Sequence, residues 1–191
     1  MKQKIKTFLD QYLSDIVSSI SKADIIEIER ASDLILKTIK KKQTIFVCGN
    51  GGSAAISNHY ICDYLKFLRQ HSNLKPKVIS LSTNIETITA ISNDFSYDQV
   101  FRYQAESLFN KNDLLIAISS SGESENIKEV VKFSKKKKVK VIGFSGFKGG
   151  FLKRNSDVSV HVPIKNYGVA EDSHHILMHV ILQYLIEGQK K

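Results

Sequence analysis

The sequence has few of the residues that cross-link or interrupt a chain. Its 191 residues include two cysteines, two prolines and no tryptophan. Cys48 and Cys62 have neither the number nor the spacing of a disulfide framework or a zinc motif, so we expect both to be reduced and packed. The prolines are Pro76 and Pro163, and no repeat or low-complexity linker marks a boundary. We therefore expect 1–191 to form one domain, long enough to bury a sizeable core.

Long apolar runs are also missing. No stretch reaches the about 20 residues of a transmembrane helix. The first eight residues alternate lysine with isoleucine and phenylalanine and lack the apolar segment of a signal peptide. Hydrophobic residues make up 42% and charged residues 25%, which is typical of a soluble globular chain and excludes wholesale disorder. We expect a cytoplasmic protein with no membrane partner.

The charge balance is basic. Twenty-eight lysines and arginines against 19 acidic residues give a net charge of +9, with lysine runs at 40–42 and 135–138. A basic patch can bind nucleic acid by displacing counterions from phosphates. However, the run at 135–138 follows an amphipathic helical pattern, where cations favour the helix C-terminus, and no aromatic platform accompanies it. We do not expect a nucleic-acid partner.

The hydrophobic spacing predicts an α/β fold. Two amphipathic helices, at 2–21 and 24–40, are followed by short β-type segments alternating with helical ones, a pattern typical of a parallel sheet flanked by helices. The β-type segments are 44–48, 77–81, 113–118, 139–144 and 158–162. A final helix at 170–187 is apolar on more than one face and needs cover on several sides. We expect a homo-oligomer in which the helical pair, within 1–42, packs between subunits of the 43–191 core.

Two turns carry the polar chemistry. The first, Cys-Gly-Asn-Gly-Gly-Ser at 48–53, follows an apolar strand pattern, and a serine-rich turn at 119–124 follows another. Ligands of open α/β sheets bind at the carboxyl ends of strands, where glycines allow close backbone approach and helix N-termini favour anions. Neither turn has the spacing of a dinucleotide or nucleoside triphosphate motif. The pair predicts a monophosphate ester and no nucleotide cofactor, although either turn alone would read as an ordinary βα turn with an N-cap serine.

Ionisable residues recur at helical spacing beyond the first turn. His59 and Asp63 are four residues apart, and Glu171, His175 and His179 repeat the same interval on the last helix. If the two helices pack together, His59, Asp63, Glu171 and His179 offer a four-ligand set for zinc or a similar divalent ion. The alternative is that they form surface pairs.

These residues resemble a known family. The turn at 49–55, the serine loop at 119–124, the Asn-Asp-Phe segment at 93–95 and the helix bearing 171–179 look like the sugar isomerase (SIS) family, and most like its phosphoheptose isomerase branch. The resemblance spans nearly the whole chain. It implies a three-layer sandwich with a five-stranded parallel sheet, assembled as a homotetramer with active sites at subunit interfaces.

The resemblance also assigns roles. It implies aldose–ketose isomerisation of a phosphorylated sugar, sedoheptulose 7-phosphate to D-glycero-D-manno-heptose 7-phosphate, for surface polysaccharide synthesis. His59 and His179 match zinc ligands. The expected substrate-contacting positions are Asn50, Gly51, Gly52 and Ser53, then Asn93 and Asp94, the phosphate-binding serines Ser119, Ser120, Ser121 and Ser124, and Glu171.

Three positions depart from the family pattern. Asp63 replaces a glutamate, Glu171 replaces a glutamine, and Phe67 stands where an arginine is usual, with Lys66 and Arg69 nearby. The first two keep oxygen ligands but change reach and charge. A set of His59, Asp63, Glu171 and His179 would bring two carboxylates to the metal, where the family brings one.

The expected mechanism is proton transfer through a cis-enediol. Asp63 or Glu171 would act as the base and His179 would shuttle a proton to oxygen, since a histidine pKa lies near neutral pH. Two alternatives stay open at this point. One is a SIS scaffold protein without catalysis, of the kind that assembles the bacterial replication initiator, and the other is an isomerase of a pentose or hexose phosphate.

Overall fold

A five-stranded parallel sheet organises the chain. The computed structural model describes residues 2–189, with side chains from residue 4 onward. The strands are β1 (Thr44–Gly49), β2 (Lys77–Ser80), β3 (Leu114–Ser119), β4 (Lys140–Ser145) and β5 (Val158–His161), in the spatial order β2-β1-β3-β4-β5. Every pair is parallel, and Ile45 of β1 lies opposite Val78 and Leu114. The predicted α/β class is confirmed, and each strand lies within one residue of its predicted bounds.

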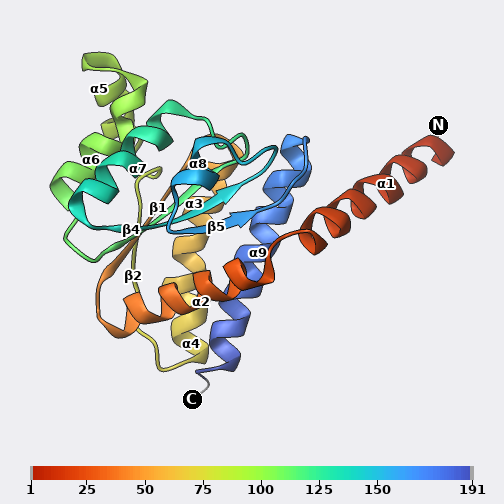
Figure 1. Ribbon diagram of the computed structural model, residues 1–191, viewed down its shortest axis with the longest axis horizontal. Coiled ribbons are helices and arrows are strands. Elements are labelled where there is room, and N and C mark those ends of the chain that lie inside the picture. The colour runs from red at the N-terminus through yellow and green to blue at the C-terminus, as the bar shows by residue number, and fades with distance from the viewer. Residues whose placement is uncertain (1, 190–191) are drawn as a thin grey trace.

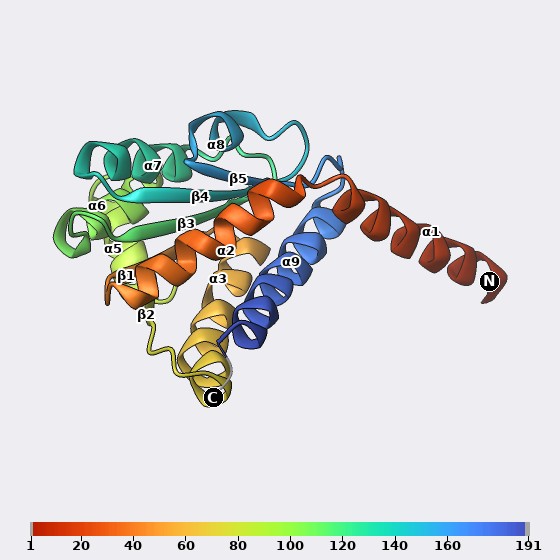
Figure 2. The same cartoon turned by 60° about the horizontal axis from the view of Figure 1, so that its bottom comes forward.

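Alternating side chains divide the sheet between two cores. Ile45 and Val47 of β1 join one hydrophobic cluster, whereas Phe46 and Cys48 join the other, as the period of a strand requires. The first cluster lies under α2 (Ile25–Lys40), α3 (Gly52–Cys62) and α9 (Tyr167–Glu187). The second lies under α5 (Ile85–Asp94), α6 (Val100–Leu108), α7 (Glu125–Lys137) and α8 (Gly150–Asn155). Figure 2 shows the two helical layers on opposite faces of the sheet.

The first helix, α1 (Lys2–Ser21), projects from this three-layer body (Figures 1 and 2). Its second half is attached to the start of α9, where the Tyr12 hydroxyl donates a hydrogen bond to Asp172 over 2.8 Å and the hydroxyls of Ser19 and Ser173 lie 2.8 Å apart. Its apolar side chains are largely exposed. These are Ile5, Phe8, Leu9, Leu13 and Val17.

The helix after β1 is not regular. It changes to a π-helix, η1 (Asp63–Leu68), and ends with α4 (Arg69–His71). A single turn of 3-10 helix, η2 (Tyr97–Gln99), joins α5 to α6. The expectation that both cysteines are packed is wrong for Cys62, which is exposed at the end of α3, while Cys48 is buried in β1.

The last helix, α9, starts three residues before its predicted start. The Asn166 side chain accepts a hydrogen bond from the amide of Val169 and caps the helix, a role that favours asparagine. The buried residues of α9 lie on several of its sides, as predicted, because it packs against α1, α2 and α3. Within residues 2–189, no helix is long and apolar enough to cross a membrane.

Candidate functional site: a serine pocket beside a histidine cluster

A pocket of about 130 Å³ opens at the carboxyl ends of β1 and β3. The β1–α3 turn, the β3–α7 loop and the first turns of α9 form its walls, as expected for a parallel sheet. The lining residues are Asn50, Ser53, Ile118, Ser119, Ser120, Ser121, Ser124, Tyr167 and Glu171. The two turns singled out in the sequence therefore share one pocket.

The serine loop presents hydroxyls and a helix N-terminus to this pocket. The hydroxyls of Ser119 and Ser124 lie 3.2 Å apart, and Ser119 also accepts from the amide of Gly122 over 3.2 Å. The buried Ser120 hydroxyl has no hydrogen-bond partner among the described residues. Ser124 is the N-cap of α7 but makes no side-chain cap hydrogen bond. The loop thus offers unpaired donors at the positive end of a helix, an arrangement suited to an anion.

The glycine turn depends on close approach. Gly51 has φ of 54° and caps α3, a conformation that favours glycine. A Cβ on Gly52 would collide with the carboxylate of Glu171. Since the Glu171 carboxylate occupies the space above Gly52, it is held at the N-terminus of α3, beside the serine pocket.

Asn50 is fixed by its neighbours. Its side-chain amide exchanges two hydrogen bonds of 2.9 Å with the buried Asn126 of α7, and its oxygen also accepts from the Tyr97 hydroxyl over 2.9 Å. Asn126 and Tyr97 were not singled out in the sequence, because only the fold brings their segments beside the first turn.

Glu171 is the acid of the serine pocket. Burial raises its pKa above the ordinary value, and the neighbouring Asp172 raises it further. A raised pKa increases the proton affinity of the carboxylate at near-neutral pH, which suits a general base.

A cluster of imidazoles lies further along the same two helices. The Nε2 atoms of His59 and His179 are 3.2 Å apart. Oδ2 of Asp63 lies 3.4 Å from His59 Nε2 and 3.1 Å from His179 Nε2. The structure therefore brings together three of the four residues of the predicted metal set.

His175 joins this cluster, although it was not in the predicted metal set. Nitrogens of His59, His175 and His179 lie within 4.8 Å of one another. The His175 ring stacks on His179 with centroids 4.6 Å apart and meets His59 edge-on at 4.8 Å. Burial lowers the pKa of His175, and the nearby His179 and His59 lower it further. Its i, i+4 spacing from His179 was the available signal.

The donor atoms fit a small divalent ion. Tetrahedral bonds of about 2.0 to 2.1 Å place neighbouring donors about 3.3 Å apart. The three edges between His59, Asp63 and His179 measure 3.1, 3.2 and 3.4 Å. Imidazole and carboxylate are ligands that zinc accepts. The residues present therefore fit the metal that the family resemblance implies.

Asn93 and Asp94 lie elsewhere. Both are exposed at the end of α5, where the Asn93 side chain donates to Asp94 over 2.9 Å, and neither lines the serine pocket. Their segment approaches the pocket through Tyr97 and its bond to Asn50. Of the remaining predicted positions, Phe67 is partly exposed on η1. Tyr167 also lines the pocket, although no sequence motif singled it out.

Comparison with known proteins identifies relatives over the whole fold. The SIS domain family model matches residues 8–146. A phosphoheptose isomerase from Campylobacter concisus is 35% identical over 161 residues, covering 84% of this chain and 85% of the relative. One from Buchnera aphidicola is 35% identical over 192 residues, covering 100% of this chain and 97% of the relative.

Solved structures agree with the sequence relatives. A phosphoheptose isomerase from Francisella tularensis superposes with a TM-score of 0.87 at 26% identity, covering 97% of each chain. One from Neisseria gonorrhoeae has a TM-score of 0.85 at 26% identity, covering 96% of this chain and 97% of that chain. The chain therefore belongs to the SIS domain family and, within it, to the phosphoheptose isomerases.

Proposed function

We propose that the chain is a sugar-phosphate isomerase that converts sedoheptulose 7-phosphate to D-glycero-D-manno-heptose 7-phosphate. Its relatives with 35% identity are phosphoheptose isomerases. The observation that carries the proposal is the junction of the serine pocket, Glu171 and the imidazole cluster along α3 and α9. Such a junction holds a phosphate at one end and acts on a carbonyl at the other.

The phosphate is assigned to the serine loop. The unpaired Ser120 hydroxyl and the uncapped N-terminus of α7 supply neutral donors and a positive dipole end. Fixing the phosphate also fixes the sugar chain, which lowers the entropic part of the barrier. Asn50, held in place by Asn126, is assigned to a sugar hydroxyl.

The abstraction of the proton is assigned to Glu171. Glu171 removes a proton from C1 of the open-chain ketose while the carbonyl oxygen at C2 gains one, which gives the cis-enediol. Loss of the proton on O1 and return of a proton to C2 completes the aldose, so no external oxidant or reductant is needed. Glu171 is preferred to Asp63 as base because an oxygen of Asp63 is already shared by two imidazoles.

A divalent metal ion, with zinc the best fit, is assigned to His59, Asp63 and His179. Such an ion supplies Lewis-acid polarisation of a sugar oxygen when bound. In the chain itself, one oxygen of the Asp63 carboxylate contacts both imidazoles. The reacting end of the sugar is therefore assigned to the space beside these groups.

We also propose that the chain works as a homo-oligomer, with a tetramer as the form that the family resemblance implies. The support is the exposed apolar side of α1 together with the exposed Ile176, Val180 and Tyr184 of α9. Exposed patches of this kind mark interaction surfaces.

An isomerisation assay by NMR tests the function. A heptulose 7-phosphate, a pentulose 5-phosphate and a hexulose 6-phosphate are supplied separately, with and without chelator. We expect turnover of the heptulose phosphate, and its loss in both the Glu171→Gln and the His179→Ala variants. Turnover of only a shorter sugar would establish the alternative substrate, and no turnover of any sugar would favour a scaffold protein.

A further inference from the structure

The family resemblance implies His59, Asp63, Glu171 and His179 as the metal donor set. We propose that His175, and not Glu171, completes the set, so that three imidazoles and one carboxylate hold the ion: His59, Asp63, His175 and His179. This proposal rests on the metal site of the proposed function and deepens it. It assigns to His175 a role that the family resemblance does not give.

The position of His175 supports the assignment. Its Nε2 atom is buried and has no hydrogen-bond partner among the described residues, and the cluster nitrogens lie within 4.8 Å of one another. A buried polar atom without a partner is unfavourable, and a metal ion beside it would satisfy that atom. His175 lies one helical turn before His179, and its ring stacks on that of His179 with centroids 4.6 Å apart.

The position of Glu171 argues against its place in the set. Its carboxylate lies over Gly52 at the start of α3 and lines the serine pocket. His59 and Asp63 come seven and eleven residues after Gly52 along the same continuous helical segment, which places them roughly 10 Å or more along its axis. Glu171 therefore stays available to the substrate.

Metal binding to the purified protein tests the donor set without reference to turnover. Zinc affinity is measured by chelator competition, and the first coordination shell is measured by X-ray absorption of the zinc-loaded protein. We expect His175→Gln to weaken zinc binding by at least about tenfold, the lower end of what even outer-shell changes cost, and to remove one imidazole from the shell. Glu171→Gln should leave both measurements unchanged, and His71→Gln, at an exposed histidine of α4, serves as the matched control.

The reverse pattern overturns the proposal. If Glu171→Gln weakens zinc binding while His175→Gln does not, the ion is held by the family set. If the wild-type protein binds no zinc, both assignments of the metal fail. A protein that binds zinc through His175 but turns over no sugar phosphate would instead overturn the proposed function alone.

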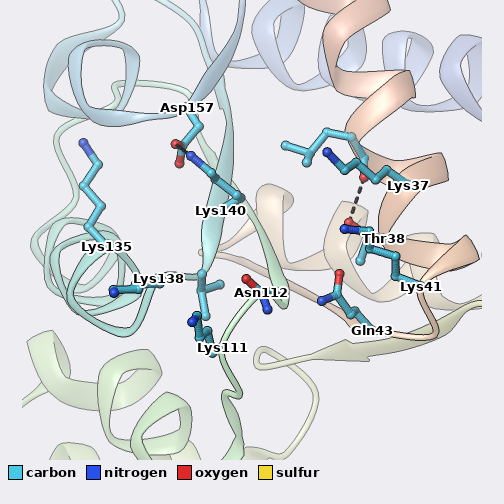
Figure 3. A pocket seen from close by; sticks show the side chains of 12 residues that line it. Lys37, Thr38, Lys41, Gln43, Lys111, Asn112, Lys135, Lys138, Lys140 and Asp157 are labelled. Carbon is cyan, nitrogen blue, oxygen red and sulfur yellow. Dashed lines mark hydrogen bonds and ion pairs between the residues drawn. The ribbon is translucent and has the colours of Figure 1, made fainter.

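A second inference concerns the opposite end of the sheet. A cavity of about 530 Å³ lies there, between the C-termini of α2 and α7 and the starts of β3 and β4. Figure 3 shows lysines from four segments around it. They are Lys37, Lys41, Lys111, Lys135, Lys138 and Lys140.

The charge of this cavity is poorly compensated. Only Lys140 has an ion pair among the described residues, with Asp157, the one acidic residue of the lining. Six ammonium groups and one carboxylate give a local net charge of +5. The two helix C-termini contribute about half a negative charge each, which leaves roughly +4. The negative ends of the two helix dipoles therefore compensate only a small part of the positive charge of these lysines.

We infer that this cavity binds a small polyphosphate group. Its volume falls within the range of small-molecule sites, and a concave surface of one charge sign concentrates counterions. A single phosphate would leave most of the lysines unpaired, whereas a chain of phosphates can contact several at once. The ligand class is thus a linear polyphosphate or the triphosphate of a nucleotide.

Calorimetric titration with tripolyphosphate and with a nucleoside triphosphate tests this site at low and physiological salt. We expect binding that weakens as salt rises, and the double variant Lys41→Gln/Lys111→Gln to lose about tenfold in affinity, the scale of one or two charge-assisted contacts. The control Lys22→Gln/Lys153→Gln removes the same charge from exposed lysines elsewhere. The stronger of the two ligands shows whether a nucleoside adds to the phosphate chain.

Binding at the serine pocket must be separated from binding at the lysine cavity. The variant Ser119→Ala/Ser124→Ala should therefore retain tripolyphosphate binding. Loss of binding in this variant, equal losses in the two lysine variants, inorganic phosphate binding as tightly as tripolyphosphate, or no binding at low salt would each overturn the lysine site.

Discussion

At the scale of single residues, the site depends on the contact between Gly52 and Glu171. Gly52 stands in the first turn of α3, and its missing side chain leaves the space that the Glu171 carboxylate occupies. The glycine is not needed for its backbone angles, unlike Gly51, whose φ is 54°. It is needed because a carboxylate of the opposing helix lies against it. This contact sets where the proposed base meets the substrate.

Gly52→Ala should therefore reduce turnover without reducing stability. The new methyl group forces Glu171 to rotate away, and misplacement of a catalytic group by about 1 Å costs up to roughly 100-fold in rate. Alanine is also a better helix former than glycine, by up to about 1 kcal/mol, so the thermal midpoint should hold or rise. Steady-state kinetics and thermal melts check both, with Gly188→Ala, whose Cβ has no neighbour closer than 3.7 Å, as control. Unchanged kcat would contradict the role of Glu171 as base.

Residue types and spacings predicted that the two turns would lie together, as they do in the pocket, but not the geometry of the side chains. The i, i+4 pair of His59 and Asp63 could be read directly, because one helix fixes their relation. Glu171, His175 and His179 follow one another at intervals of four residues and so lie on the same face of the helix. The sequence alone therefore could not tell whether Glu171 or His175 lies beside the imidazoles of His59 and His179. The answer depends on how α3 and α9 pack against each other. Gly52 has no side chain, and the Glu171 carboxylate occupies the space that this leaves beside the serine pocket.

At the scale of elements, α9 combines packing and chemistry. His175 and His179 face the cluster with α3, while the adjacent His174 is fully buried and meets Phe144 of β4 edge-on, with centroids 6.0 Å apart. Because α9 packs against several elements, it is apolar on several sides, as predicted. The π-helix that begins at Asp63 was not predicted, because its register shift leaves no mark in the hydrophobic period. Such turns are frequent at functional sites.

The buried His174 should make the fold sensitive to acid. Burial lowers its pKa from 6.5 to about 4, against the opposing effect of the Ser145 backbone. The unfolded chain therefore binds this proton more readily than the folded one, and stability falls as pH drops from about 6.5 toward 4, by up to about 3 kcal/mol. Urea unfolding of the metal-free protein measures this loss. His174→Gln should flatten the curve in this window, whereas His71→Gln should not; equal slopes in all three proteins would contradict the assignment.

At the scale of the whole molecule, the sheet order and helix layers position both ends of the chemistry. The serine loop and the glycine turn meet because β1 and β3 are neighbours in the sheet. The parallel direction of the strands alone predicted that both would lie at the carboxyl ends of the strands. The lysine cavity lies at the opposite end of the strands, near the starts of β3 and β4. Its lysines come from segments far apart in sequence, so the composition signalled excess charge but not where it gathers. The projecting α1 is the remaining feature that one chain does not explain.

The apolar side of α1 should be the centre of the subunit interface. Phe8 is 65% exposed and Leu13 is 51% exposed on a helix that extends away from the body, and burying such a side chain contributes about 1.5 to 3 kcal/mol. Phe8→Lys/Leu13→Lys should therefore convert the oligomer to smaller species, as measured by size-exclusion chromatography with light scattering. Ser14→Lys adds charge to the polar side of the same helix and should leave the assembly intact. A wild-type protein that is monomeric at micromolar concentration would contradict the interface, because the apolar side of α1 would then have no partner subunit to contact.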